Sequence, residues 1–294
     1  MMSVPENNNQ ISLLIHLLDD RDEFVRSRVR DQLIEIGEDA LPFLEIAVRT
    51  ENPTLRVMAT HVIQAIFPKQ LGEKFRQLAL STRGGDLNLE AGIILLMEFG
   101  HPHSRPEEVT GALDQIAAKL RNRLDPENSP EQAVKTLVQF LFIEQGFLGN
   151  ESNYLDPDNS YFNKVLERKT GIPITLSVLC LLIARRLNLP IVGVGLPGHY
   201  IVKFASPTNP VFFDPFHKGR ILQREDCVQI INRAGFKFEE HHLSQSTHLE
   251  TLVRMINNLV AAYSQTGELE KAQQLKEYIG ILLSSPQSIS AQSS

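Results

Sequence analysis

Residues 170–188 read TGIPITLSVLCLLIARRLN, and this stretch predicts the centre of the fold. Apolar side chains fill most of it, and Pro173 stands where a helix could start, because the fixed φ of proline suits a first turn. The apolar segment is far too short to cross a bilayer, which needs about 20 such residues. We expect a core helix over residues 174–188 with one apolar face, formed by Leu176, Leu179, Ile183 and Leu187.

Short segments that alternate as β-strands do come next along the chain. His199 follows a Pro-Gly turn before one of them, and Asp214 ends another. Their spacing of 15 residues suits two neighbouring strands joined by a Pro-rich turn, which would bring the two side chains together. We therefore expect a small antiparallel sheet packed on the helix, with its strands in IVGVGL (191–196), HYIVKF (199–204), VFFD (211–214) and RIL (220–222).

The rest of the chain carries helical periodicity. Residues 11–36 and 41–66 align at an offset of 30, so each copy predicts a pair of amphipathic helices. Val25-Arg26 and Leu55-Arg56 open the second helix of each copy, a feature that resembles HEAT-type repeats. Further helices are expected at 87–99, 108–124, 129–145 and, as a pair that resembles one tetratricopeptide unit, 249–284.

Composition narrows the class of protein. The chain has 294 residues, enough for about two domains. Its 35 acidic and 29 basic residues give a net charge of −6, which leaves no broad cationic face for nucleic acid. Two cysteines do not make a disulfide framework, and the N-terminus lacks the features of a secretory signal. We expect a soluble cytoplasmic protein without a nucleic-acid or membrane partner, with flexible ends at 1–9 and 285–294.

Three segments together resemble the uncharacterised bacterial SirB-type family. They are NYLDPDNSYFNKVLERKTG (153–171), GVGLPGHYIVKF (193–204) and FFDPFHKGRIL (212–222). The resemblance covers about residues 85–285 and implies an α+β fold, mostly helical, with a small antiparallel sheet packed on a central helix, as in transglutaminase-like proteins. It implies a transglutaminase-like core with its preceding helices at 81–240 and a tetratricopeptide-like helix pair at 241–284. The HEAT-like helix pairs, at 10–80, lie outside the shared part.

The resemblance implies that active members of the superfamily have a thiolate in the first turn of the central helix. There, free N–H groups and the positive helix end lower the pKa of the thiol. A histidine on the next strand would take the proton, and an acid would orient the imidazole. The nucleophile is therefore expected at residues 173–175, and none of these is cysteine. Cys180 lies roughly 9 Å further along the axis at the helical rise per residue, among leucines, which is typical of a core thiol. No general base is placed near Cys227, so we expect it to be structural or merely exposed.

The remaining polar residues give only partial sites. His199 and Asp214 are candidates for a vestigial catalytic pair, and Thr175 and Ser177 are secondary candidates as hydroxyl nucleophiles, with helix capping as their simpler role. Residues 156–159 carry side-chain oxygens at nearly alternate positions, as a calcium-binding loop does. The glycine and the terminal glutamate of such a loop are absent, so we expect a turn that caps the next helix. His241 and His242 form an isolated pair in a polar linker. We expect no bound metal and no cofactor.

Two functions follow from this sequence. The first is a non-catalytic transglutaminase-like protein that acts through protein–protein contacts, because the cysteine nucleophile is missing while helical repeats, which form concave binding surfaces, flank the core. The alternative is an amide or ester hydrolase, or an acyl transferase, that uses His199 and Asp214 with Thr175, Ser177 or a water as nucleophile.

Overall fold

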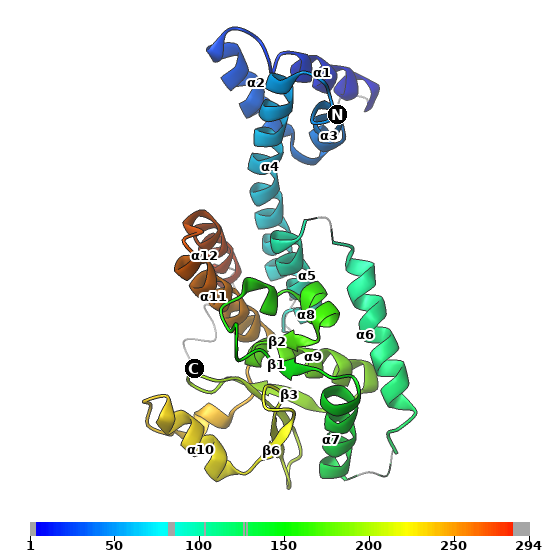
Figure 1. Cartoon of the computed structure of the whole chain (residues 1–294), viewed down its shortest axis with the longest axis vertical. Coiled ribbons are helices and arrows are strands. Elements are labelled where there is room, and N and C mark those ends of the chain that lie inside the picture. The colour runs from blue at the N-terminus through cyan, green and yellow to red at the C-terminus, as the bar shows by residue number, and fades with distance from the viewer. Residues whose placement is uncertain (1–3, 82–85, 103, 126, 128, 285–294) are drawn as a thin grey trace. The chain divides into compact units, whose positions relative to one another are not determined.

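The chain folds into two compact units, residues 1–74 and residues 75–294. The computed structural model describes residues 4–81, 86–102, 104–125, 127 and 129–284 (Figure 1). Of the two predicted flexible ends, residues 1–3 and 285–294 lie outside the described residues. Residues 4–9 instead belong to the first helix, which has Pro5 in its first turn, where the missing N–H of proline costs no hydrogen bond.

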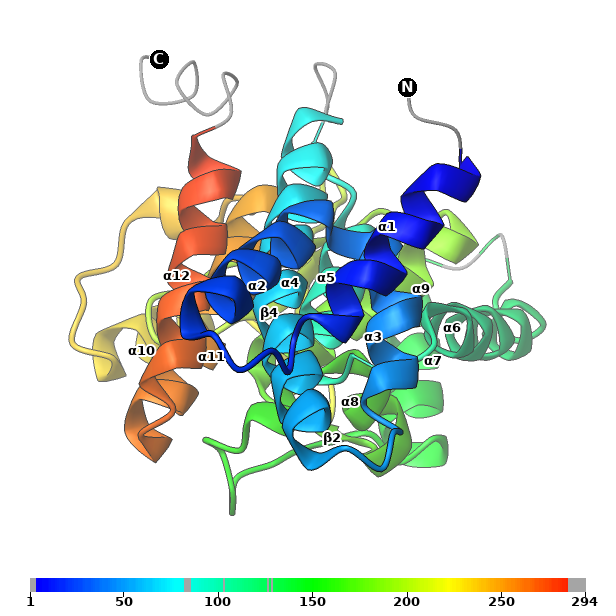
Figure 2. The same cartoon turned by 90° about the horizontal axis from the view of Figure 1, so that it is seen from above.

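The first unit holds the repeat. Its helices are α1 (Val4–His16), α2 (Glu23–Ile36), α3 (Leu41–Ala47) and the first part of α4 (Pro53–Leu80) (Figure 2). The Asp22 side chain starts α2 by accepting the N–H of Phe24 at 2.8 Å. Matching positions of the two copies lie in one core, among them Ile11, Leu14, Val29 and Leu33 from the first copy and Leu44, Leu55, Ala59 and Ile66 from the second.

Helices open the second unit as the sequence predicts. The Ser129 hydroxyl and the Gln132 side chain form a capping box that begins the third of them. That helix continues as a π-helical turn over Gln139–Glu144, although the pattern predicts an α-helix to residue 145. Gly146, at φ +74°, follows this turn. The helices are α5 (Leu89–Gly100), α6 (Pro106–Arg121), α7 (Pro130–Val138) and α8 (Phe162–Arg168).

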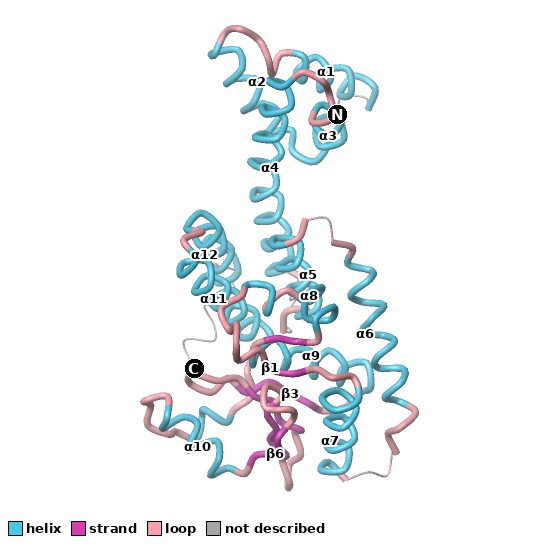
Figure 3. The backbone as a smooth tube through the Cα atoms, viewed as in Figure 1, coloured by secondary structure: helices cyan, strands magenta, loops and turns pink. Residues whose placement is uncertain are grey.

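The predicted antiparallel sheet is present (Figure 3). Its strands are β3 (Ile191–Val194), β4 (Ile201–Phe204), β5 (Val211–Asp214) and β6 (Arg220–Leu222). They have the order β3-β4-β5-β6. Ile201 and Phe212 point to the face where helix α10 (Arg224–Arg233) packs. Val202 and Phe213, also buried, point the other way because side chains alternate along a strand. A parallel pair that the sequence did not predict joins β1 (Leu148–Gly149) to β2 (Thr170–Gly171).

Helix α9 (Pro173–Leu187) starts at the predicted proline but differs from the predicted amphipathic helix. All its residues from Pro173 to Ala184 are buried, so it has no solvent face over its first three turns. It contacts β3 and β4 on one side and α6 and α11 on others, which leaves no direction open to water. Leu187, expected on the apolar face, lies beyond this part and is half-buried.

Two antiparallel helices complete the second unit, α11 (His248–Thr266) and α12 (Leu269–Leu283). They lie side by side in both views (Figures 1 and 2) and are joined at Gly267, whose φ of +84° ends α11. The Tyr278 ring of α12 stacks on Phe75 at a centroid distance of 4.9 Å. The predicted fold class, α+β with a small antiparallel sheet on a central helix, is confirmed. Among the described residues, no helix is long and apolar enough to cross a membrane.

Leu179→Asp tests the placement of α9. The Leu179 side chain is fully buried, so the substitution places an unpaired carboxylate in the core. We expect a loss on the order of 4 kcal/mol in the free energy of unfolding, at the upper end of single substitutions. Thermal denaturation of Leu269→Asp serves as the control, because Leu269 is 65% exposed in the first turn of α12. Equal melting temperatures for the two variants would contradict this position of the helix.

Candidate functional site

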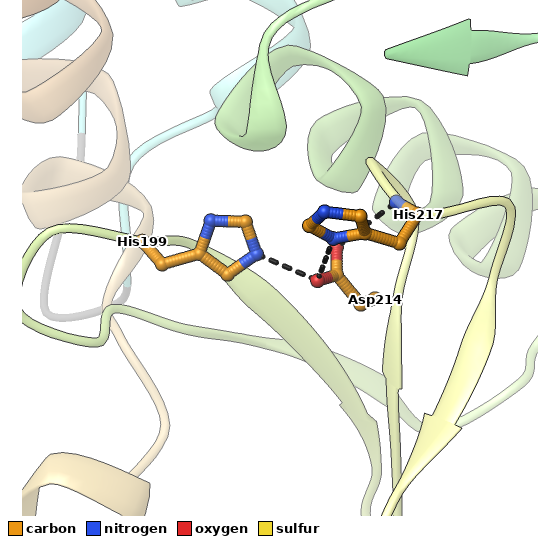
Figure 4. Close-up of side chains that lie close together, drawn as sticks. All are labelled: His199, Asp214 and His217. Carbon is orange, nitrogen blue, oxygen red and sulfur yellow. Dashed lines mark hydrogen bonds and ion pairs between the residues drawn. The ribbon is translucent and has the colours of Figure 1, made fainter. Parts of the chain in front are cut away.

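The site begins with the two residues that the sequence singles out. His199 lies in the turn that leads into β4, and Asp214 is the last residue of β5. Since β4 and β5 are neighbours, these positions meet at one end of the sheet. His199 Nε2 lies 2.7 Å from Asp214 Oδ2 (Figure 4), and the two side chains are 12% and 3% exposed. The structure therefore places the predicted pair in direct contact.

Asp214 has more partners than the sequence indicates. Its Oδ1 accepts the backbone N–H groups of Phe216, at 3.0 Å, and His217, at 3.4 Å. Its Oδ2 lies 2.7 Å from Nδ1 of His217 as well as from the His199 ring. Burial alone would raise the pKa of this carboxyl, but the hydrogen bonds and charges of His199 and then His217 hold the pKa below its usual value. Asp214 is therefore a carboxylate at neutral pH.

His217 is the site residue that the sequence analysis missed. It stands three residues after Asp214, and the loop folds back so that its ring reaches the carboxylate (Figure 4). Lys218 and Gly219, both at positive φ, carry the chain from this loop toward β6. The His217 side chain is 55% exposed, in contrast to the other two members of the cluster. An Asp-x-x-His spacing at the end of a strand was the signal available, since such a turn brings the two side chains together.

Aromatic side chains form one wall of the site. Phe216 lies edge-on to His199 and His217, with ring centroids 6.3 Å and 5.2 Å away. Gly149 packs under Phe216, where a Cβ would come within 2.5 Å of the ring, so only glycine allows this approach. Tyr154, from the segment between β1 and α8, meets the Phe216 ring at 6.1 Å. This segment therefore lies beside the histidines.

Helix α11 fixes the turn that carries His199. The Arg254 guanidinium donates hydrogen bonds to the backbone carbonyls of Leu196 and His199, each at 2.7 Å. Burial lowers the pKa of Arg254, and the nearby Tyr200 and Tyr154 partly offset this effect. Gly198 adopts a φ of +73° in the same turn, a conformation that other residues rarely take. The C-terminal helices thus position the imidazole.

The two hydroxyl candidates stand on α9. Ser177 Oγ donates to the carbonyl of Tyr200 at 3.3 Å, so it ties the helix to the residue after His199. Thr175 Oγ1 is buried and has no hydrogen-bond partner among the described residues. Neither hydroxyl is hydrogen-bonded to the His199 ring within that part of the chain, and neither caps the helix through its side chain. The structure therefore does not join them to the His199–Asp214 pair.

Neither thiol of the chain is available as a nucleophile. Cys180 and Cys227 are both fully buried and unbonded. Burial raises the pKa of the Cys180 thiol, and burial followed by the charge of Asp226 raises the pKa of Cys227 to about 11. Both sulfurs are therefore protonated at neutral pH. Cys227 belongs to α10 and packs against the sheet, in a cluster with Val194 and Ile201.

The other polar groups that the sequence raised have structural roles. Asp156 begins a 3-10 turn, Pro157–Asn159, by accepting the N–H of Asp158 at 3.0 Å, and both carboxylates pair with Arg168. The ring centroids of His241, which is exposed, and His242, which is half-buried, are 4.3 Å apart. His242 Nδ1 accepts the backbone N–H of Glu239 at 3.1 Å, and the Glu239 carboxylate lies 3.2 Å from the His241 ring.

Thiol labelling tests this assignment of the cysteines. Iodoacetamide should leave both thiols of the native chain unmodified and label both after denaturation, because the reagent attacks exposed thiolates. Mass spectrometry counts the adducts, and Ser152→Cys, at an exposed position, provides a thiol that should label in the native state. Labelling of Cys180 in the native chain as fast as the thiol introduced by that substitution would contradict the assignment.

Comparison with known proteins gives the family. A model of the transglutaminase-like superfamily matches residues 107–257, from α6 into α11. The UPF0162 protein of Xylella fastidiosa is 36% identical over 140 residues, 46% of this chain and 50% of that protein. The UPF0162 protein of Pseudomonas aeruginosa is 31% identical over 170 residues, 57% of this chain and 62% of the relative.

A third relative has a different overall organisation. F-box only protein 21 of Homo sapiens is 27% identical over 165 residues, which is 52% of this chain but 25% of that protein. The chain thus spans about half the length of the bacterial relatives and less of the human one, and no solved structure matches it. The family model covers more than half of the chain, including α9, the turn that carries His199 and the strand that ends at Asp214. The chain therefore belongs to the transglutaminase-like superfamily.

Proposed function

We propose that this chain is a non-catalytic transglutaminase-like protein that acts by binding another polypeptide. The observation that carries the proposal is the position of its sulfur atoms. The resemblance implies a reactive thiolate in active relatives, yet Cys180 lies fully buried in the middle of α9 and Cys227 lies fully buried on α10. A protonated sulfur without solvent access has no route to a substrate.

Exposed apolar side chains on the segment whose Tyr154 contacts Phe216 support a protein partner. Leu148, Tyr154 and Leu155 are 43%, 45% and 39% exposed and belong to one short segment. Tyr154 is anchored at one edge by the Phe216 ring, so it presents a rigid aromatic side chain to solvent. Such anchors, large and low in conformational entropy, dominate the binding energy of protein interfaces. We assign this apolar surface, Leu148, Tyr154 and Leu155, as the contact for the partner.

Further parts of the proposal concern the organisation of the chain. The two repeat copies act as HEAT-like helix pairs at 10–80, the core with its preceding helices spans 81–240, and α11 and α12 act as a tetratricopeptide-like pair at 241–284. Repeats of these kinds present concave surfaces to other polypeptides. We infer from the resemblance of the three quoted motifs that the chain is a SirB-type protein. Its net charge of −6 and its two thiols support a cytoplasmic protein that does not bind nucleic acid.

The alternative function is hydrolysis or acyl transfer by the His199–Asp214 pair. The contact of 2.7 Å between Nε2 and Oδ2 favours it, since a carboxylate in this position orients an imidazole that acts as general base. The His199 ring would then activate a water, or Thr175 or Ser177 after a change of side-chain conformation. Membership of the transglutaminase-like superfamily is compatible with either function, and so is the similarity to the UPF0162 proteins and to F-box only protein 21.

Photo-crosslinking tests the partner surface. A photoreactive phenylalanine in place of Tyr154 should crosslink the full chain, in extracts of the source cells, to one reproducible protein. The same group in place of Phe236, 53% exposed on the segment after α10, is the control. Tyr154→Ser combined with Leu155→Ser should weaken binding of the captured protein by at least about tenfold, because an anchor is lost. Equal crosslinking at both positions, or unchanged affinity of the double variant, would contradict the proposal.

Activity measurements test the alternative. The enzyme hypothesis requires that the chain hydrolyse ester or amide substrates, or transfer an acyl group to an amine, and that His199→Ala reduce the rate at least about a hundredfold, the lower range for loss of a general base. The binding proposal predicts no turnover above that of the His199→Ala variant. Turnover that depends on His199 would replace the proposed function with the alternative.

A further inference from the structure

Three metal-ligating side chains converge at the end of the sheet. His199 comes from the turn before β4, Asp214 from the end of β5 and His217 from the loop that follows (Figure 4). One ligand atom from each lies within 4.8 Å of the other two. Among the residues that the structure describes, this is the only group of three histidine, cysteine or acidic side chains with that property.

We propose that His199 Nε2, Asp214 Oδ2 and His217 Nδ1 bind a divalent transition-metal ion. Two imidazole nitrogens and one carboxylate oxygen form the ligand set that non-haem Fe²⁺ and similar ions take, with the remaining positions open to water or substrate. Asp214 ends a strand, and hydrogen bonds hold the turn of His199 and the loop of His217, so little ordering is needed when the ion binds. This inference goes beyond the proposed function and does not depend on a protein partner.

The distances favour a six-coordinate ion. Each histidine nitrogen lies 2.7 Å from the same oxygen of Asp214. At metal–ligand bonds of about 2.1 Å, neighbouring ligand atoms are about 3.0 Å apart in an octahedron and about 3.4 Å apart in a tetrahedron. The observed 2.7 Å is the length of the hydrogen bonds that the ion would replace, and it is shorter than either value, so the rings would move apart slightly. The octahedral sites that this ligand set forms with Fe²⁺ and similar ions need the smaller movement.

The surroundings hold the ligands in place. Asp214 Oδ1 is occupied by the N–H groups of Phe216 and His217, which leaves Oδ2 directed at the two rings. Arg254 fixes the backbone at His199 through its carbonyl. Because Asp214 is buried while the His217 side chain is 55% exposed, an ion would have access from solvent on one side and a protein environment on the other.

Metal binding and the general-base role exclude each other. In the structure, both rings are hydrogen-bonded to Asp214 through the nitrogens that would ligate the ion. To bind the ion, the ligating nitrogen of each ring gives up its proton, and the ring keeps an N–H at its other nitrogen, Nδ1 in His199 and Nε2 in His217; no electron is transferred. With the ion bound, His199 no longer donates to Asp214, so the orienting hydrogen bond of a catalytic pair is lost.

Titration with Co²⁺ alone tests the site. The full chain, first treated with a chelator, should bind one ion and show the weak visible bands of six-coordinate Co²⁺. His217→Ala removes a ligand at an exposed position, and we expect the dissociation constant to rise at least about tenfold, the lower range for loss of a residue that only orients a metal ligand. His241→Ala combined with His242→Ala, which removes the neighbouring histidine pair outside the cluster, should leave the constant unchanged.

Nuclear magnetic resonance adds a reading that needs no variant. Paramagnetic Co²⁺ should broaden the ring signals of His199 and His217 before those of His241 and His242. Absence of saturable Co²⁺ binding would overturn the proposal. So would unchanged affinity in His217→Ala, or broadening that begins at His241 and His242.

Discussion

The structure of the second unit depends on a helix that has no solvent face. From Pro173 to Ala184, every side chain of α9 is buried between strands β3 and β4 and helices α6 and α11. Each fully buried leucine of this kind stabilises the fold by about 2 kcal/mol relative to an exposed one. The same burial surrounds Cys180 with apolar groups and raises the pKa of its thiol. The packing that stabilises the core therefore also keeps this sulfur protonated and away from any substrate.

A second constraint acts at the end of the sheet, where one buried carboxylate gathers two imidazoles and two backbone N–H groups. Asp214 is satisfied at both oxygens, and such a fully bonded buried network specifies a single arrangement of the loop that follows β5. Arg254 extends this order to α11 by holding the turn that carries His199. The site is therefore a rigid part of the fold, whether it serves a partner surface, a metal ion or a substrate.

Much of this could be predicted from the sequence where a local pattern determines the structure. The alternation in IVGVGL, HYIVKF and VFFD reflects the two faces of one sheet, and Pro173 and Ser129 carry start signals within their own turns. The continuous apolar run of α9 does not indicate which sides of the helix other elements cover. The prediction of a single apolar face was therefore wrong, because the helix is buried on all sides. His217 and Arg254 were missed because their roles depend on a loop fold and on a contact 55 residues distant along the chain.

The central claim is that this domain acts without a thiol, and a chain that lacks both cysteines tests it most directly. Cys180→Ala combined with Cys227→Ala removes the two sulfurs, with some loss of stability from the cavities left behind. The measurement is the affinity of this folded variant for the protein that crosslinks at position 154. The account predicts an affinity equal to that of the unaltered chain. A variant that remains folded and no longer binds or acts on that protein would contradict it.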